Sequence, residues 1–198
     1  MHEYKCRIVR VVDGDTVDVD IDLGFGVWLN NQRVRLYGID TPECRTRDRE
    51  EKYYGFMAKA LVKDFLPEGS TQRLSTRLKG KGRGKFGRIL GEFWVYDAWT
   101  DRETTLNKAL LVRNYAVKYD GQSKKEIEDS HKLNRETICK RLGYEKDFFK
   151  SKYSAENYKK QREDIILQPA RCSAQIGQPF AAPWQLSQLG PEAKKKRK

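Results

Sequence analysis

The chain has 198 residues, which is enough for one domain of ordinary size with its own hydrophobic core and too few for two such domains. Its 40 lysines and arginines against 28 aspartates and glutamates give a formal charge of +12 and a pI of about 9.5. This charge favours a polyanionic partner, nucleic acid first, although many basic domains bind no such partner.

Four cysteines are widely spaced and form no C-x-x-C pair, a pattern that predicts reduced thiols rather than a zinc or redox site. They are Cys6, Cys44, Cys139 and Cys172. No apolar leader follows Met1, and no run approaches the roughly 18 apolar residues of a membrane span. We therefore expect a cytoplasmic protein with no membrane partner. The basic run 193–198 is either a solvated or nucleic-acid-contacting tail, which is favoured, or a nuclear import signal.

Three strands are predicted near the start of the chain. Residues 4–12 are rich in Ile and Val, and residues 16–23 alternate strictly between apolar and polar side chains. Residues 24–31 then connect to a third strand that should end near Thr41, because Pro42 cannot donate to a ladder. The aromatic side chains of this connection could contact a partner or pack over the strands, and packing is favoured.

The middle of the chain predicts a helix followed by two more strands. Apolar residues recur at helical spacing over residues 50–66, and Pro67 should end that helix. Residues 72–78 and 88–95 have the composition of strands, and a loop of alternating basic residues and glycines joins them.

The last predicted elements are a short helix around residues 106–110, an extended segment at 115–119 and a mostly charged helix over 124–142. Five short strands, with helices after the third and the fifth, follow the element order of an OB-fold barrel. We therefore expect an α+β, mainly β fold: a five-stranded OB-fold barrel with three helices over residues 1–145. Residues 146–198 lack apolar periodicity and should form a basic, largely disordered extension.

Two acidic corners interrupt the predicted strands. The segment 11–17, VVDGDTV, is an acidic turn that leads into a strand, and the segment 33–43, RVRLYGIDTPE, is a strand that opens into two carboxylates. The two corners can meet in space. Because Arg35 and Asp40 have opposite strand parity, both reach one site only if the chain bends near Gly38.

Together with KFGR at residues 85–88, these two segments resemble the three motifs of the staphylococcal nuclease (thermonuclease) family, in the same order and at similar spacing. The resemblance covers about residues 4–142. It implies a metal-dependent endonuclease that hydrolyses DNA and RNA without sugar specificity and leaves 3′-phosphate ends. It also implies Ca²⁺ as the cofactor in preference to Mg²⁺ or Mn²⁺, nucleic acids as the substrates, and a monomer. The missing leader favours an intracellular, phage-type member.

The resemblance implies that Asp15, Asp40 and the backbone carbonyl of Thr41 bind the metal. Hard oxygen donors such as these carboxylates suit Ca²⁺ or Mg²⁺ rather than zinc. The alternative is purely structural, with Asp15 capping a turn and Asp40 ending a strand.

The resemblance also implies roles for three catalytic residues. Glu43 is similar to the residue that activates or positions the attacking water, and Arg35 and Arg88 match the two arginines that hold the scissile phosphate. Alternatively, Arg35 forms an ion pair on the outer face of its strand. Lys52, which could equally be a solvated charge, is one of three expected substrate contacts. The three are Lys85, Tyr119 and Lys52.

The competing interpretation is a noncatalytic nucleic-acid or protein-binding module with a nuclease-like fold, similar to the degenerate repeats of Tudor-containing RNA-binding proteins. Such repeats usually lack several of the charged site residues, whereas all five are present here, which favours the enzyme. Two positions depart from the family pattern. Phe86 stands where a Tyr is frequent and Gly84 where an acidic residue is common, so contacts to the substrate should differ.

Overall fold

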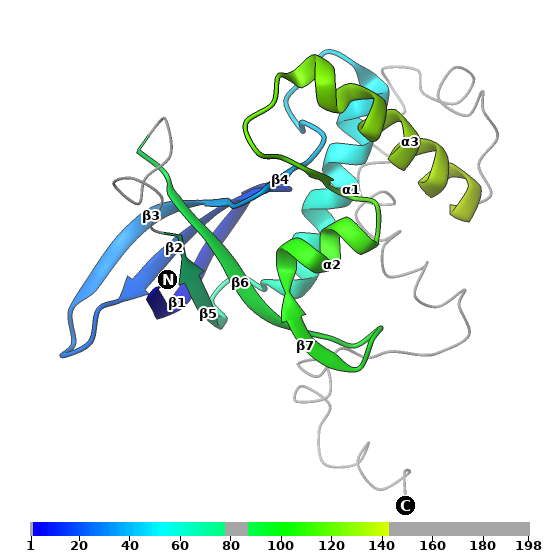
Figure 1. Ribbon diagram of the computed structural model, residues 1–198. Helices are drawn as coiled ribbons and strands as arrows, with labels where there is room; N and C mark the ends of the chain where they lie inside the picture. The colour runs from blue at the N-terminus through cyan, green and yellow to red at the C-terminus, as the bar shows by residue number, and fades with distance from the viewer. Residues whose placement is uncertain (1, 78–86, 143–198) are drawn as a thin grey trace, which may run out of the picture.

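Six of the described strands build one strongly curled sheet (Figure 1). The computed structural model describes residues 2–77 and 87–142. The strand order is β3-β2-β1-β5-β6-β7, and β3 also pairs in parallel with β6, so that the sheet curls back on itself. A separate short pair joins β4 to β8. The bounds are β1 His2–Asp13, β2 Thr16–Asp22, β3 Trp28–Leu36, β4 Ile39–Asp40, β5 Thr71–Thr76, β6 Ile89–Asp97, β7 Arg102–Thr105 and β8 Val117–Lys118.

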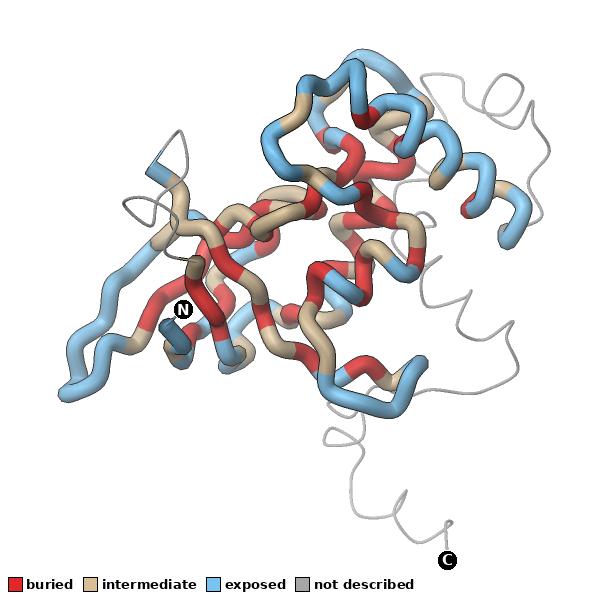
Figure 2. The backbone as a smooth tube through the Cα atoms, in the orientation of Figure 1, coloured by how far each residue is buried: buried red, intermediate tan, exposed pale blue. Residues whose placement is uncertain are grey.

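The hydrophobic core lies inside this curl and between the sheet and the helices, and Figure 2 colours its buried positions red along the backbone. Alternate residues of the first three strands face inward, and Ile8, Val17, Val19 and Val34 are at most 1% exposed. The register pairs Ile8 with Val19 and Val17 with Val34, so each ladder places one apolar residue beside another. The expected mainly β fold with three helices is confirmed, and β7 is a strand that the sequence did not predict.

Three helices cover one end of the sheet (Figure 1). They are α1 Arg49–Phe65, α2 Leu106–Val112 and α3 Lys124–Leu142, close to the predicted ranges. Asp48 caps α1 by accepting the backbone N–H groups of Glu50 and Glu51 at 2.8 and 3.2 Å. No helix in residues 2–77 and 87–142 is both long and apolar enough to cross a membrane.

Residues 24–31 are part of a β-hairpin rather than a long connection. Residues 24–27 form its tip, and residues 28–31 begin its second strand, β3. The backbone N–H of Leu23 donates to the carbonyl of Val27 at 2.9 Å, which closes the turn between β2 and β3. Phe25 sits at this tip with a φ of +53° and is fully exposed. The expectation that these aromatic residues pack over the domain is therefore wrong for Phe25, because the tight turn carries the tip away from the core.

Helix α1 approaches both acidic corners closely at two glycines. A Cβ atom on Gly14 would lie 2.7 Å from the Thr41 Oγ1, and one on Gly55 would lie 2.7 Å from the Glu43 carbonyl carbon. The Lys59 Nζ also donates to the Val12 carbonyl at 2.8 Å. These contacts fix the turn before β2 and the loop after β4 against the same helix.

Two parts of the predicted organisation lie outside the described residues: the proposed boundary near residue 145 and the extension 146–198. Cys6, Cys44 and Cys139 are free thiols, as expected, and Cys172 lies in that extension.

A buried ion pair joins β6 to the loop after α2. The Arg113 Nη2 donates to the Asp97 Oδ1 at 2.5 Å, with side chains only 10% and 4% exposed. Burial by itself would raise the pKa of Asp97, but the hydrogen bond and charge of Arg113 outweigh it and lower that pKa. The carboxylate form of Asp97 is therefore part of the folded state.

Replacing Asp97 with Ala should lower the free energy of unfolding by about 3 to 5 kcal/mol, because Arg113 is left as a buried, uncompensated charge. Urea denaturation at neutral pH measures this loss. Because folding lowers the pKa of Asp97, its ion pair contributes stability above the unfolded-state pKa, and this contribution is lost as the pH falls through the folded-state pKa. The difference in the free energy of unfolding between wild type and variant should therefore become smaller in acid. Glu103, which pairs with Arg73 at the surface, is the control, and Glu103→Ala should cost less than about 1 kcal/mol. Equal losses for both variants would contradict this assignment.

Candidate active site

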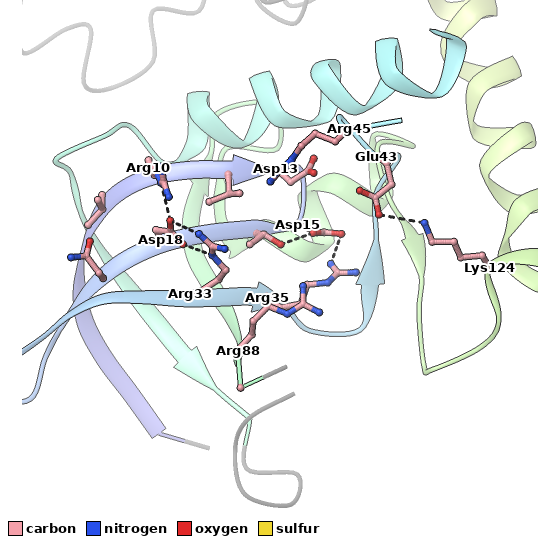
Figure 3. Close-up of a pocket in the computed structure, with 15 residues that line it drawn as sticks. Arg10, Asp13, Asp15, Asp18, Arg33, Arg35, Glu43, Arg45, Arg88 and Lys124 are labelled. Atoms are coloured by element: carbon pink, nitrogen blue, oxygen red, sulfur yellow. Dashed lines mark hydrogen bonds and ion pairs between the residues drawn. The ribbon is translucent and has the colours of Figure 1, made fainter. Parts of the chain in front are cut away.

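A groove of about 1070 Å³ runs along the outer face of β1, β2 and β3 and ends beside the two acidic corners (Figure 3). Most of its lining side chains are charged. Those nearest the corners are Asp13, Asp15, Arg35, Glu43, Arg45, Arg88 and Lys124.

Arg35 links the two corners. Its Nη2 donates to the Asp40 Oδ1 at 2.9 Å, and its Nη1 forms an ion pair with the Asp15 Oδ2. The side chains of Arg35 and Asp15 are each 13% exposed and that of Asp40 is 21% exposed. Gly38, with a φ of +72°, makes the turn between β3 and β4 that brings Arg35 and Asp40 together, so the predicted bend is confirmed.

The surroundings of Asp15 disfavour its negative charge. Burial raises the pKa of Asp15 to about 6, although Arg35 and a hydrogen bond from the Thr16 hydroxyl lower it. The neighbouring carboxylates of Asp40 and Asp13 raise that pKa further. Because burial is the main cause, a further positive charge beside Asp15 would favour its carboxylate form.

Glu43 lies on the other side of the groove, with its side chain 47% exposed. The Lys124 Nζ, from the first residue of α3, donates to the Glu43 Oε1 at 3.4 Å. Desolvation lowers the pKa of Lys124, but the charges of Glu43 and Asp40 outweigh it and raise that pKa. Lys124 thus stays a cation in this part of the groove.

His131 is a site residue that the sequence analysis missed. Its Nε2 lies 3.2 Å from the Asp40 Oδ2, and the residue is only 8% exposed. Asp40 is therefore held through both oxygens, by Arg35 from β3 and by His131 from α3. A signal was present in the sequence, because His131 shares the helical spacing of Ile127 and Ile138, the apolar residues of the buried face of α3.

The remaining predicted residues fall into two groups. Arg88 lines the groove beside Arg35, since Ile89 pairs with Val34 across β6 and β3, and Thr41 is buried against Gly14. Two predicted substrate contacts are not brought into the groove, and the third lies outside the described residues. Lys52 lies on α1 and Tyr119 lies just after β8, neither among the described residues that line it, and Lys85 lies outside the described residues.

The donor set fits a hard divalent cation. Oxygen atoms of Asp15 and Asp40 converge on one guanidinium, so this point of the fold already accommodates positive charge. Within the described ranges no three His, Cys, Asp or Glu side chains group closely enough to bind a metal alone. A cation here would need backbone carbonyls, water or substrate phosphate to complete its ligands, as Ca²⁺ and Mg²⁺ commonly do.

Comparison with known proteins gives one family and several distant relatives. A family model described as staphylococcal nuclease homologue matches residues 33–143. A thermonuclease from Staphylococcus intermedius is 33% identical over 46% of this chain and 48% of its own length, so the chain spans about half of that relative. Protein ParB from Escherichia coli is 27% identical over 81% of each chain. A micrococcal nuclease from Shigella flexneri is 26% identical over 71% of this chain and 73% of its own.

The matched segment begins at Arg33, just before the Arg35 that links the corners, and ends just after α3, which supplies Lys124 and His131. It therefore covers most of the groove's charged residues and more than half of the chain. The chain belongs to the staphylococcal nuclease homologue family.

Proposed function

We propose that this protein is a metal-dependent endonuclease that hydrolyses phosphodiester bonds of DNA and RNA. The observation that carries the proposal is the groove in which Arg35, Arg88 and Glu43 lie beside the carboxylates of Asp15 and Asp40. These groups supply phosphate binding, water activation and cation binding, which phosphodiester hydrolysis requires. Family membership supports a nuclease-like activity, and cleavage that leaves 3′-phosphate ends is part of the proposal.

Arg35 and Arg88 bind the scissile phosphate. Guanidinium forks can donate to two phosphate oxygens at once, which a lysine ammonium cannot match in geometry. The Nη1 of Arg35 is buried and makes no well-directed hydrogen bond within the described part of the chain, although it is ion-paired with Asp15. Both Nη atoms of Arg35 face carboxylates, so a scissile phosphate would share this guanidinium with Asp15 and Asp40.

Glu43 orients and deprotonates the attacking water. Its carboxylate is exposed in the groove, while its backbone is fixed against Gly55 of α1. Asp15 and Asp40, with the Thr41 carbonyl, would hold Ca²⁺ there. A bound divalent cation would add positive charge beside the phosphate and stabilise the developing negative charge.

The fold supports the same proposal. We infer that β1, β2, β3, β5 and β6 form a five-stranded OB-type barrel, since the pairing of β3 with β6 joins the two ends of that strand order. Side chains fill the inside of the curl, so the substrate must bind outside it, where the groove lies.

Removing either of two transition-state groups should lower kcat while leaving stability nearly unchanged. We expect Arg88→Ala and Glu43→Gln each to depress kcat about 10²- to 10³-fold, because each group acts on charge that develops in the transition state. Arg35→Ala should lower kcat in the same way and should also raise KM. Steady-state cleavage of plasmid DNA measures both constants. Arg102→Ala on β7, outside the groove lining, is the control and should keep full activity. An Arg88→Ala variant that cuts as fast as wild type would contradict the proposal.

Chelation of Ca²⁺ with EGTA should abolish cleavage, and added Ca²⁺ should restore it. Mg²⁺ should restore less activity, because it demands a stricter octahedral shell than two carboxylates and flexible ligands provide. Asp40→Asn should raise the Ca²⁺ concentration needed for half-maximal cleavage, and isothermal titration calorimetry should show the same weakening without substrate. Full cleavage in EGTA, or none with Ca²⁺, Mg²⁺ or Mn²⁺, would refute metal-dependent hydrolysis.

Gly55→Ala should lower kcat by displacing Glu43, because the added methyl group would meet the Glu43 backbone at 2.7 Å and the Pro42 carbonyl at 2.8 Å. Alanine is favoured over glycine in a helix by about 1 kcal/mol, so helix propensity alone predicts a more stable variant with normal activity. Kinetics and thermal unfolding together decide between the two expectations. An active and stabilised Gly55→Ala variant would show that the close contact does not position Glu43.

A further inference from the structure

The outer face of the first three strands carries an ordered row of arginines. Asp18 of β2 accepts from the Arg10 Nε at 2.8 Å and from the Arg33 Nε at 2.7 Å, and Asp20 accepts from the Arg7 Nη2 at 2.8 Å. The aspartate side chains are at most 10% exposed, whereas those of the arginines are 46% to 61% exposed. The buried aspartates thus fix the positions of the exposed guanidinium groups. Three arginines over two aspartates leave the row positively charged.

This row continues the groove of the candidate active site. Arg10, Arg33 and Asn31 line the same groove as Arg35 and Arg88 (Figure 3). Arg33 precedes Arg35 by two residues on β3, so both side chains face the same side of the strand. A polyanion held at Arg35 therefore meets further arginines along β3, in the direction of the β2–β3 hairpin.

The row ends at an apolar hairpin tip. Phe25 is fully exposed, Trp28 is 39% exposed, and the Arg7 guanidinium lies 5.7 Å from the centroid of the Trp28 ring. Besides the Leu23–Val27 bond, the Val27 N–H donates to the Gly24 carbonyl at 2.9 Å. The tip therefore presents its aromatic side chains on a hydrogen-bonded turn.

Charge and continuity identify the occupant of this surface. An apolar tip alone would fit many partners, but a protein or a second copy seated along the row would have to cover its exposed arginines. A nucleic-acid strand fits both the arginine row and the aromatic tip, because its phosphates match the guanidinium groups and its bases stack on aromatic rings without sequence preference. From Arg35 to Trp28 the strand spans roughly 23 Å. That is about seven phosphate steps at the spacing of one strand in a duplex.

We propose that the outer face of β1–β3 binds the nucleic-acid strand beyond the cleaved bond, with phosphates along Arg33, Arg10 and Arg7 and bases stacked on Phe25 and Trp28. This inference rests on the proposed function for the direction of the strand, since the scissile phosphate is its starting point. It makes the hairpin tip a binding element for long substrates that short ones do not reach.

Fluorescence anisotropy with labelled single-stranded DNA tests the proposal in EGTA, where no cleavage is expected. Wild type should bind an oligonucleotide of about 15 nucleotides more tightly than one of about 4 nucleotides. Phe25→Ala and Trp28→Ala should each weaken binding of the long oligonucleotide about 5- to 100-fold and leave the short one unchanged. The control is Tyr96→Ala, which removes from β6 an aromatic residue whose exposure, 48%, is close to the 39% of Trp28. It should bind both lengths like wild type.

Several results would overturn the proposal. These are equal binding of both lengths by wild type, no binding at either length, and unchanged long-oligonucleotide binding in both tip variants. Dissociation of a dimer by Phe25→Ala in analytical ultracentrifugation would overturn it too, since the tip would then cover a second copy.

The proposed hydrolysis and the proposed binding surface can each be refuted without refuting the other. If wild type cuts nothing with any divalent cation but the tip variants lose long-oligonucleotide binding, the proposed hydrolysis is wrong and the binding surface remains. If cleavage depends on Arg88 and Glu43 while the tip variants bind normally, the hydrolysis stands and the surface is wrong.

Discussion

Close packing at two glycines, Gly14 in the turn before β2 and Gly55 within α1, is the constraint on which the candidate site depends. Gly14 allows Thr41 and Ala58 to approach the turn before β2, and Gly55 allows the helix to touch the backbone of Glu43. Neither position has room for a side chain without a shift of its neighbours. The acidic corners come from separate strands, and a single rigid helix sets the distance between them. The site is thus a consequence of how the helix sits on the sheet.

Electrostatics at the two corners centre on Arg35. Arg35 pairs with two carboxylates, and burial is the main cause that raises the pKa of one of them, Asp15, to about 6. Along the outer face the balance is reversed, since buried Asp18 carries two exposed arginines. The same pair of residue types therefore forms two arrangements on one sheet: a partly buried arginine between two carboxylates at the corners, and exposed arginines over buried aspartates along the outer face.

The sequence predicted most of the local structure and much of the site. Period-two alternation predicted the first strands, apolar spacing predicted α1 and α3, and strand parity predicted the bend at Gly38. Tertiary placement was out of reach, because nothing local shows that the buried face of α3 turns His131 toward Asp40. The exposure of Phe25 was missed for the opposite reason. Hydrophobicity predicts burial, but the geometry of a tight turn decided against it.

The position of α3 has a consequence for the order in which the site matures during synthesis. Asp15, Arg35 and Asp40 leave the ribosome early, whereas Lys124 and His131 belong to the last described helix. A growing chain can pair β1, β2 and β3 by local hairpins, but β6 must be made before it can join β3, and α3 later still. The second anchor of Asp40 is therefore missing until α3 has been synthesised, so the contacts that hold Asp40 are completed later than the strands that carry it.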